Sequence, residues 1–458
     1  MIKRLSKLKG ILPTSQKGFL ERHYQGRLSD LNNRKKLVLV LMLTFGVVFS
    51  ASAVKLQIWM TGETPERLQI LTDLMESDLT PRTGITAEFT PLPWTDSDHK
   101  FLLAAASGET PDLAMTAVLL PAEMGIRGAA VDLKKAFGTE FDKVASVHFP
   151  NTFTSYTFQN AVFAVPYRVE SNPMIVRYDI LQNLGFSVPK TWDELRTMLP
   201  KLQANQMNFT QTFGIGEESF RPFSMFVWQN GGRFFNDDLT ASAWDEPEAI
   251  KGFTELVELY TKYKIPVEDV PIETFRRGEA PIMLLPWWTY GSFQQGLPEL
   301  AGKWGIELVP GTMRNGKLDQ TSWFGGTPLI IFNKSKHQKE AWEWIKWVTQ
   351  PEIQGELAKR TIEKIPGSLL LPSVPEAYNM LPLPEKHREV FRDQAKASKA
   401  PVFTVASERI INRYIQFALN EAVVQGVSPD VAIKKAAQGV NMDLKTKWAE
   451  WKRFISKL

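Results

Sequence analysis

Apolar and polar positions follow a regular order along residues 54–115. Short strand-like runs occupy residues 55–59, 85–91 and 111–115. Between them, residues 66–80 repeat apolar side chains at helical spacing, and residues 98–107 form a second helical stretch that Gly108 ends. This strand–helix–strand–helix–strand order predicts a mostly parallel sheet with helices on both faces. Ligands of such sheets lie at the carboxyl ends of the strands.

Residues 159–199 predict a crossing between two lobes. Residues 161–165 are a short apolar run that we expect Pro166 to end, because proline has no N–H for a central strand. A strand-like pattern resumes over residues 174–178. The intervening side chains are polar or aromatic, and we expect them to lie where the lobes face each other: Tyr167, Arg168, Glu170 and Asn172.

Helix-capping residues follow the second strand of this segment. We expect Asp179 to cap a short helix and Gly185 to end it. Thr191 and Glu194 have the spacing of a capping box at the start of the next helix.

Two later segments complete the predicted connections between the lobes. Residues 323–331 indicate a loop that enters a strand, and Gly325 and Gly326 there can absorb a rotation at low cost. Residues 367–375 are a third expected crossing. These positions assign residues 54–166 and 326–370 to lobe 1, and residues 167–325 and 371–458 to lobe 2. Helices are expected at residues 410–419, 431–437 and 444–451.

The N-terminal 53 residues have the organisation of an export signal. Residues 37–49 are a 13-residue apolar run, Arg34-Lys35-Lys36 precedes it, and Ala51-Ser52-Ala53 follows it. The run is shorter than the ~20 residues that a membrane-spanning helix needs. Because 36 residues precede it, an uncleaved anchor is the alternative. Either case predicts an exported, periplasmic or extracellular protein.

Charge and composition exclude several classes of protein. The chain of 458 residues has a net charge of +4, but residues 1–53 hold 10 Lys or Arg and 2 Asp or Glu. The other residues hold 44 and 48, so a nucleic-acid-binding function is not supported. The absence of cysteine excludes disulfides, thiolate metal sites and a lipid-modified cysteine. We expect two or three domains and a monomer.

Motifs for catalysis or cofactor binding are missing. The five histidines have no metal-ligand spacing, and the sequence contains neither a nucleophile elbow nor a P-loop. We therefore expect no metal and no cofactor. A glycosidase needs only two facing carboxylates, for which Glu63, Asp112 and Glu170 are candidates. The alternative role of these side chains is to bind sugar hydroxyl groups.

The 14 tryptophans fall into two groups. Trp342, Trp344 and Trp347 share a predicted helix with apolar residues, as expected for core packing. Trp448 and Trp451 are interpreted in the same way. The second group lies at strand ends or beside Gly and Pro, and predicts an aromatic-lined cleft of the kind that stacks on sugar rings: Trp59, Trp94, Trp228, Trp287, Trp288 and Trp323.

Several of these segments resemble, in order, one known family. They are residues 107–113 (SGETPDL), 163–166 (FAVP), 178–179 (YD), 189–195 (PKTWDEL), 228–234 (WQNGGRF) and the spacing from Phe275 through Gly278 to Trp288. They are similar to the extracellular solute-binding proteins of ATP-driven sugar importers, the maltose-binding-protein-like group. Pro281 and Ile282 stand where this family usually has Ala and Met.

The resemblance implies a fold and a function. The fold is α/β, with two lobes on mixed sheets, about three hinge crossings and a ligand cleft between the lobes. The function is capture of a mono- or oligosaccharide by hinge closure and its delivery to permease subunits of an ABC importer, without catalysis. A carbohydrate-active enzyme and a membrane-tethered sugar sensor are the alternatives, and polyamines, phosphate esters or peptides are alternative ligands. The expected ligand-binding residues are Trp59, Glu63, Trp94, Asp112, Tyr167, Arg168, Trp228, Trp287, Trp288, Trp323 and Gly325.

Overall fold

The computed structural model describes residues 54–212, 214–216, 218–267, 272–405 and 407–456. The export signal or anchor predicted for residues 1–53 lies outside these ranges. Within them, no helix combines the length and apolarity that crossing a bilayer requires.

A mixed five-stranded sheet forms the first half of the molecule. Its strand order is β2 (Ile85–Leu92), β1 (Val54–Thr61), β3 (Leu113–Met115), β13 (Phe324–Ile331) and β6 (Val165–Ser171). The first three strands are parallel, as predicted, whereas β13 is antiparallel to both of its neighbours. The late segment β13 therefore joins the sheet that the N-terminal residues begin.

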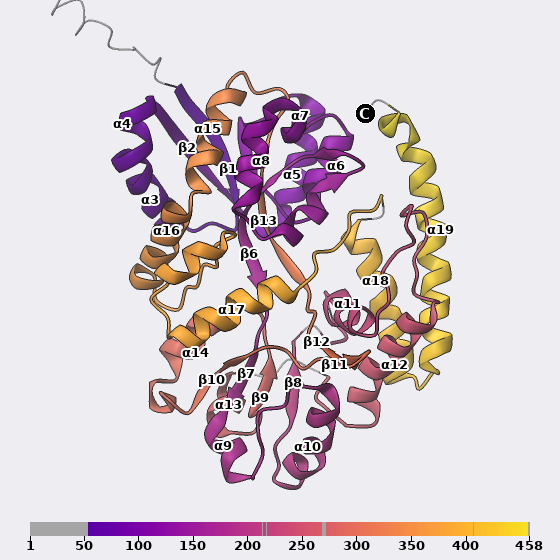
Figure 1. Ribbon diagram of the computed structural model, residues 1–458. Helices are drawn as coiled ribbons and strands as arrows, with labels where there is room; N and C mark the ends of the chain where they lie inside the picture. Colours follow the sequence, from indigo (N-terminus) through magenta and orange to yellow (C-terminus); the bar gives the residue numbers. More distant parts are fainter. Residues whose placement is uncertain (1–53, 213, 217, 268–271, 406, 457–458) are drawn as a thin grey trace, which may run out of the picture. The chain divides into compact units, whose positions relative to one another are not determined.

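Helices cover both faces of this sheet (Figure 1). One group comprises α3 (Pro65–Leu74), a π-helical turn (Met75–Leu79), α4 (Thr80–Thr83), α15 (Gln338–Val348) and α16 (Pro351–Lys364). The other comprises α5 (Trp94–Ser107) and α6 (Leu120–Ile126). α7 (Leu133–Phe137) and α8 (Thr139–Ser146) instead contact α15 of the first group, through the stacked rings of Phe137 and Trp342 and the ion pair of Glu140 with Lys346. Trp342, Trp344 and Trp347 of α15 are at most 2% exposed, which confirms their prediction as core residues.

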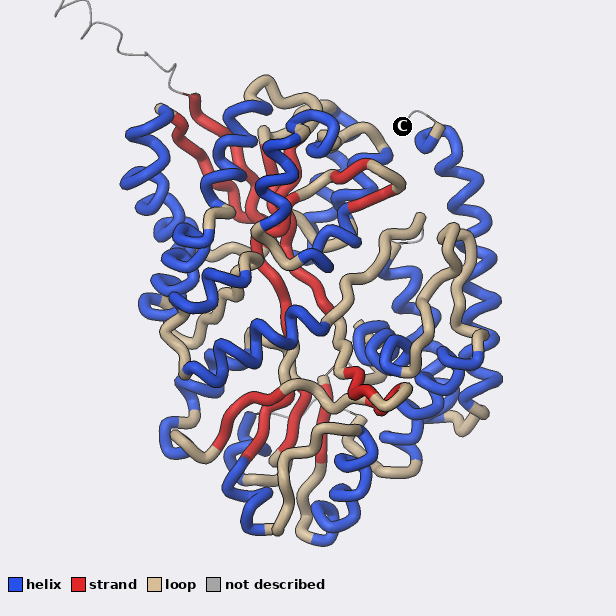
Figure 2. The backbone as a smooth tube through the Cα atoms, in the orientation of Figure 1, coloured by secondary structure: helices blue, strands red, loops and turns tan. Residues whose placement is uncertain are grey.

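A four-stranded sheet forms the second half (Figure 2). Its order is β10 (Trp304–Glu307), β7 (Met174–Arg177), β9 (Ile282–Leu284) and β8 (Phe209–Gln211), and only β8 and β9 pair in parallel. Near it lie α9 (Tyr178–Asn183), α10 (Trp192–Ala204), α13 (Ile272–Arg277) and α14 (Thr289–Gly296). A helical group packs beside them, formed by α11 (Phe220–Gln229), α12 (Pro247–Thr261), α18 (Glu408–Leu419) and α19 (Pro429–Ile455).

Shorter elements complete the fold. α17 (Glu385–Ala397) packs on both β6 and β10, so it contacts both sheets. Two small antiparallel pairs are β4 (Thr157–Phe158) with β5 (Ala161–Val162), and β11 (Thr312–Arg314) with β12 (Lys317–Asp319).

Two of the three helix-capping predictions are confirmed by the structure. Thr191 and Glu194 form the predicted capping box, in which the Glu194 N–H donates to Thr191 Oγ1 at 3.1 Å. Gly185 follows α9 with φ of 73°, a conformation that costs glycine little. The prediction for Asp179 is wrong. This residue lies inside α9 and pairs with Arg177 at 2.8 Å, and no side chain caps that helix.

The strand expected over residues 161–165, with Pro166 as its end, is divided in the structure: Ala161–Val162 form β5, and a separate strand, β6, begins at Val165 and continues through Pro166. β6 runs from Val165 to Ser171 at the edge of its sheet, where proline is tolerated. Pro166 lies opposite Pro328, at a register shift between Thr327 and Pro328. The missing N–H groups of the two prolines thus coincide with an irregularity in the ladder.

The C-terminal helices predicted at residues 431–437 and 444–451 are one helix, α19. Gly439 in its middle does not break it. A Cβ atom at Gly439 would lie 2.3 Å from a ring carbon of Tyr414, so glycine allows α18 to pack closely against α19.

The three expected crossings lie side by side, as predicted. β6 pairs with β13, and the Val169 N–H donates to the Leu371 carbonyl at 3.1 Å. Gly325 and Gly326 are nevertheless part of strand β13 and not of a loop. A Cβ at Gly326 would lie 2.2 Å from the Arg168 carbonyl oxygen, so this glycine permits β6 and β13 to approach closely.

This close approach predicts a stability difference between two glycine substitutions. Gly326→Ala should reduce the free energy of unfolding by about 3 kcal/mol or more, because it adds a backbone clash to an unfavourable φ of 157°. Gly108→Ala is the control, since it has φ of 81° with open space around it, and should cost about 1–2 kcal/mol. Urea unfolding measures both. Equal losses would contradict the proposed packing at the crossing.

Buried His148 predicts a pH dependence of stability. Its Nδ1 lies 3.4 Å from the Ser373 carbonyl oxygen, and burial lowers the pKa of the His148 imidazole to about 4. The unfolded chain, with a histidine pKa of about 6.5, then binds more protons than the folded one between these values. The free energy of unfolding should therefore fall as pH drops from about 6.5 to about 4, by up to about 3 kcal/mol from this residue. Urea unfolding of His148→Gln should show a shallower pH slope, and an unchanged slope would contradict this assignment.

Candidate functional site

The candidate site is a cavity of about 560 Å³ between the two sheets. This volume lies within the usual range for small-molecule sites. The lining residues come from both halves of the fold and from the crossings: Gly62, Arg67, Trp94, Arg168, Glu170, Glu218, Arg221, Trp287, Trp288, Gly367, Ser368 and Leu369.

The side chains of β6 point alternately to the two faces of the sheet, and this determines which of them reach the cavity. Successive side chains of a strand point to opposite faces. Arg168 and Glu170 line the cavity, whereas Tyr167 and Val169 are at most 2% exposed and belong to the hydrophobic core. Burial raises the pKa of the Tyr167 hydroxyl. Tyr167 was expected to bind ligand, and the structure places it behind the site.

A buried ion cluster forms one wall. Glu63 accepts from Arg67 Nε at 2.6 Å, and its other oxygen lies 3.2 Å from Arg168 Nη1. Arg168 Nε also donates to Thr327 Oγ1 of β13 at 3.2 Å. Glu63 is not among the residues that line the cavity, but it holds Arg67 and Arg168, which do line it.

A second ion cluster lies at the start of α11. Arg221 Nη1 is 3.2 Å from Glu170 of β6, and Arg221 Nη2 is 2.9 Å from Glu218. The guanidinium carbon of Arg221 also lies 4.0 Å from the ring centroid of Trp323, a cation–π distance. Arg221 thus connects the crossing strand to the helical group of the second half.

Tryptophans contribute from both halves. Trp287 and Trp288 form an edge-to-face pair, with ring centroids 6.0 Å apart, at the start of α14. Asn172 Oδ1 accepts from the backbone N–H of Trp287 at 3.1 Å and so positions the turn that precedes α14. Trp94, from the first half, is 49% exposed and lies against Gly62, where a Cβ would be 2.0 Å from the indole nitrogen. These rings offer flat apolar surfaces on opposite sides of the cleft.

Trp228 and Trp323 line a neighbouring cavity of about 300 Å³. Five of the residues that line this second cavity are aromatic, and Glu408 is one of its polar residues. Burial raises the pKa of the Glu408 carboxyl to about 7, with Arg221 acting in the opposite direction. The structure thus divides the predicted tryptophans between two cavities.

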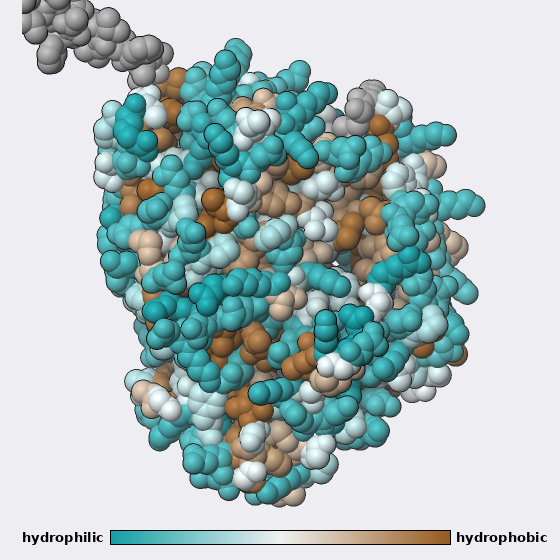
Figure 3. Space-filling view, viewed as in Figure 1, coloured by the Kyte–Doolittle hydropathy of each residue, from teal (hydrophilic) through white to brown (hydrophobic). Residues whose placement is uncertain are grey.

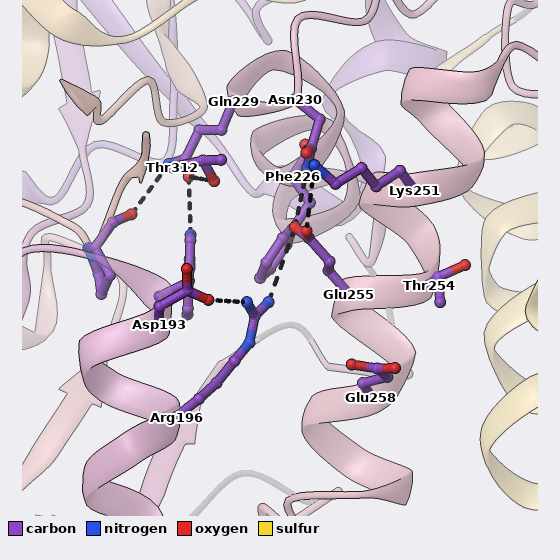
Figure 4. Close-up of polar contacts among 12 residues, drawn as sticks. Asp193, Arg196, Phe226, Gln229, Asn230, Lys251, Thr254, Glu255, Glu258 and Thr312 are labelled. Atoms are coloured by element: carbon purple, nitrogen blue, oxygen red, sulfur yellow. Dashed lines mark hydrogen bonds and ion pairs between the residues drawn. The ribbon is translucent and has the colours of Figure 1, made fainter. Parts of the chain in front are cut away.

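Gln229 fixes the helix that connects these cavities. It is fully buried at the end of α11 and accepts from Trp192 Nε1 at 2.8 Å. Its amide nitrogen donates to the carbonyls of Pro310 and Thr321 at 3.1 and 2.9 Å. Figure 4 shows Gln229 directed towards Thr312, beside the contacts of Arg196 with Asp193 and Glu255. Because α11 carries Arg221 near one end and Trp228 near the other, these contacts position both.

Three expected site residues have other contacts. Trp59 packs on Phe101, with ring centroids 5.9 Å apart. Asp112 accepts from the Gln57 N–H at 2.9 Å and from Ser335 Oγ at 2.6 Å, so it joins two chain segments. Gly325 is buried, and a Cβ there would lie 2.0 Å from the Trp323 ring. None of the three is among the residues that line the 560 Å³ cavity.

Sequence reasoning missed Arg67, Glu218 and Arg221. Arg67 has a local signal, because it follows Glu63 by four residues at the start of a helix, where such pairs meet. Arg221 has no such signal for Glu170, because these residues are 51 positions apart in the sequence. Among the described residues, no group of acidic, histidine or cysteine side chains has the arrangement of a metal site.

The buried ion cluster predicts a large cost for removing its carboxylate. Glu63→Gln should reduce the free energy of unfolding by about 3–5 kcal/mol, because it leaves buried Arg168 without its ionic partner. Glu123→Gln, which removes the more exposed pair with Arg127, is the control and should cost under about 1 kcal/mol. Urea unfolding at neutral pH measures both variants. A Glu63→Gln protein as stable as the control would show that Glu63 does not hold the two arginines.

Comparison with known proteins assigns this chain to a family. Residues 76–380, more than half of the chain, match the family model for bacterial extracellular solute-binding proteins. The chain therefore belongs to this family, as its sequence motifs predicted.

The individual proteins that this chain resembles have low sequence identity to it. The chain is 26% identical over 310 residues to the maltotriose-binding protein of Pyrococcus abyssi, a match that covers 66% of this chain and 64% of that protein. Its fold is similar to that of the sugar-binding protein MalE of Xanthomonas citri, with a TM-score of 0.75, 20% identity and coverage of 87% and 99% of the two chains. A cyclic alpha-maltosyl-1,6-maltose binding protein of Arthrobacter globiformis gives a TM-score of 0.73, 18% identity and coverage of 86% and 100%. The two-lobed α/β fold with mixed sheets is thus the fold predicted from the sequence.

Proposed function

We propose that this protein is the substrate-binding component of an ABC importer and that its ligand is a mono- or oligosaccharide. The observation that carries the proposal is the composition of the 560 Å³ cavity. Its tryptophans come from both halves of the fold, and its ion-paired Arg and Glu side chains are held by buried contacts. Aromatic faces stack on the apolar faces of sugar rings, while the charged groups bind hydroxyl groups. The maltotriose-binding relative supports the same class of ligand.

The lobe boundaries follow as part of this proposal. We assign residues 54–166 and 326–370 to lobe 1, and residues 167–325 and 371–458 to lobe 2. The ligand bridges both lobes, so it binds the closed arrangement better than an open one and shifts the equilibrium towards closure. The closed protein then docks on the permease subunits of its importer.

Two further parts of the proposal concern export and catalysis. Residues 1–53 direct the chain across the membrane, and cleavage after Ala53 releases a protein that begins at Val54. The proposal includes no catalysed reaction: Glu63 and Glu170 serve to hold arginines at the cavity, and Asp112 joins two chain segments. Product release from a panel of glycosides would contradict this and would favour an enzyme. A protein isolated with residues 1–53 attached would favour the membrane-tethered sensor.

A thermal-shift panel tests the proposed ligand class. The panel contains monosaccharides, maltodextrins, arabino-oligosaccharides, polyamines, phosphate esters and peptides. A ligand stabilises the folded state by RT ln(1 + [L]/Kd), so at a concentration a hundredfold above Kd it adds about 2.7 kcal/mol. We expect a rise in melting temperature with at least one saccharide. A rise with polyamines, phosphate esters or peptides alone would contradict the proposal.

The tryptophan pair predicts the effect of a cleft substitution. Trp288→Ala and Trp287→Ala should each weaken saccharide binding by ~1–3 kcal/mol, because each removes an aromatic surface from the cavity. Calorimetric titration measures the affinity. Phe417→Ala, an exposed aromatic residue on α18, is the control and should bind as the unsubstituted protein does. Unchanged affinity in both tryptophan variants, with a lowered melting temperature, would place the site elsewhere.

A further inference from the structure

An exposed apolar patch lies far from the residues that line the candidate site. Four large apolar side chains on α18, the following π-helical turn (Asn420–Val424) and α19 are more than half exposed. Phe417 is 58% exposed, Val424 65%, Val431 56% and Met442 67%. Single exposed apolar residues are ordinary, but a group on adjacent elements marks an interaction surface.

The same surface contains a groove of about 390 Å³ between α18 and α19. Phe417, Lys435 and Met442 are among its lining residues, and Gly439 lies on its floor, where Tyr414 packs closely. We call the exposed side chains of α18, the π-helical turn and α19 the α18–α19 face.

Basic residues follow the apolar ones along α19. Lys434, Lys445 and Lys452 are exposed and are separated by 11 and 7 residues, which are close to whole numbers of helical turns, and Lys435 and Arg453 lie next to them. Such spacing places side chains on one side of a helix, and the helix of 27 residues is about 40 Å long. Figure 3 shows hydrophilic side chains projecting along the edge that α19 forms.

Two of these five cations form an ion pair with a carboxylate of the same chain. Lys434 lies 2.8 Å from Asp430, and Lys435 pairs with Glu421. Over the described part of the chain, no carboxylate lies within ion-pair distance of Lys445, Lys452 or Arg453. Three cations of the α18–α19 face are therefore available to an external anion.

The charge distribution of residues 54–458 makes this face distinct. Residues 429–458 contain seven Lys or Arg and three Asp or Glu, whereas residues 54–428 contain 37 and 45. The C-terminal segment is thus basic on a body that is acidic. Within residues 54–458, an anionic surface is therefore attracted to this segment more than to the acidic remainder.

We propose that the α18–α19 face binds the surface of an anionic membrane. Phe417, Val424, Val431 and Met442 enter the headgroup region, and Lys445, Lys452 and Arg453 contact the lipid phosphates. This combination of exposed apolar and basic side chains on a helix is the one that binds membrane interfaces. A membrane is favoured over a protein partner because the exposed apolar side chains are accompanied by basic residues on a segment that is basic while the rest of residues 54–458 is acidic, as an anionic interface requires. The proposal does not depend on which solute the cleft binds.

Vesicle binding by the mature chain, residues 54–458, tests this proposal. These residues form one compact unit and contain both hydrophobic cores of the described structure, and they lack the N-terminal apolar run. Vesicles of phosphatidylcholine alone are compared with vesicles of equal parts phosphatidylcholine and phosphatidylglycerol, at low and high salt. We expect binding to the anionic vesicles only, and weaker binding at high salt, because salt screens these charges.

Two charge-reversal variants localise the binding. Lys445→Glu/Lys452→Glu/Arg453→Glu should weaken it on the order of a hundredfold, because each cation near an anionic surface contributes roughly a factor of five. The matched control is Lys134→Glu/Lys135→Glu/Lys143→Glu, which reverses three exposed lysines on α7 and α8 and should reduce binding far less. Circular dichroism confirms that both variants fold. Phe417→Ser/Met442→Ser should weaken binding while keeping its salt dependence.

Three results would overturn the proposal. Absence of binding to anionic vesicles at low salt is the first, and equal losses in the two charge-reversal variants is the second. The third is binding only to membranes that contain the importer, which would make the α18–α19 face a protein-docking surface. A face that forms a dimer of this chain would instead appear in light scattering as a doubled mass that the first variant abolishes, without any vesicle binding.

Discussion

The pairing of β6 with β13 is the contact on which the rest of the structure depends. Both strands belong to the five-stranded sheet, and β6 is followed after two residues by β7 of the other sheet. Gly326 allows the two backbones to approach closely, and Leu371 adds a third segment through its bond from Val169. Residues that are more than 150 positions apart in sequence therefore meet at one place. Two side chains of this ladder, Arg168 and Glu170, pair with Glu63 and Arg221 at the cleft.

The ladder also determines the chemistry of the cleft. Because β6 alternates, Arg168 and Glu170 face the cavity while their neighbours enter the core. Arg168 pairs with Glu63 of the first half, and Glu170 pairs with Arg221 of the helical group. Two residues of one strand, separated by buried Val169, thus hold partners in different halves of the fold. This arrangement gives a ligand access to both halves through side chains that are already ordered.

Local sequence patterns predicted the elements better than the site. The first three strands, the capping box at Thr191 and the buried tryptophans of α15 follow from periodicity and capping, which depend on neighbouring residues. Pro166 was misjudged because the edge of a sheet tolerates proline, and its place at the edge depends on distant segments. The two helices expected at residues 431–437 and 444–451 are one helix, in which Gly439 allows Tyr414 of α18 to pack closely. Trp94, Arg168, Trp287 and Trp288 reach the cavity as expected. Asp112 was expected in the cleft but joins two chain segments, and Arg221 lines the cavity but was not predicted, because the contacts of both involve residues far away in sequence.

Small-angle X-ray scattering tests the central claim most directly, namely that the cavity between the sheets is a ligand cleft which closes. The mature chain is measured without ligand and with a saturating saccharide identified by its thermal shift. If the ligand holds both lobes, the radius of gyration should fall on binding, because closure brings the two lobes together. Tryptophan fluorescence should change over the same range of ligand concentration. A saccharide that binds tightly yet leaves the scattering curve unchanged would contradict closure around the β6–β13 ladder.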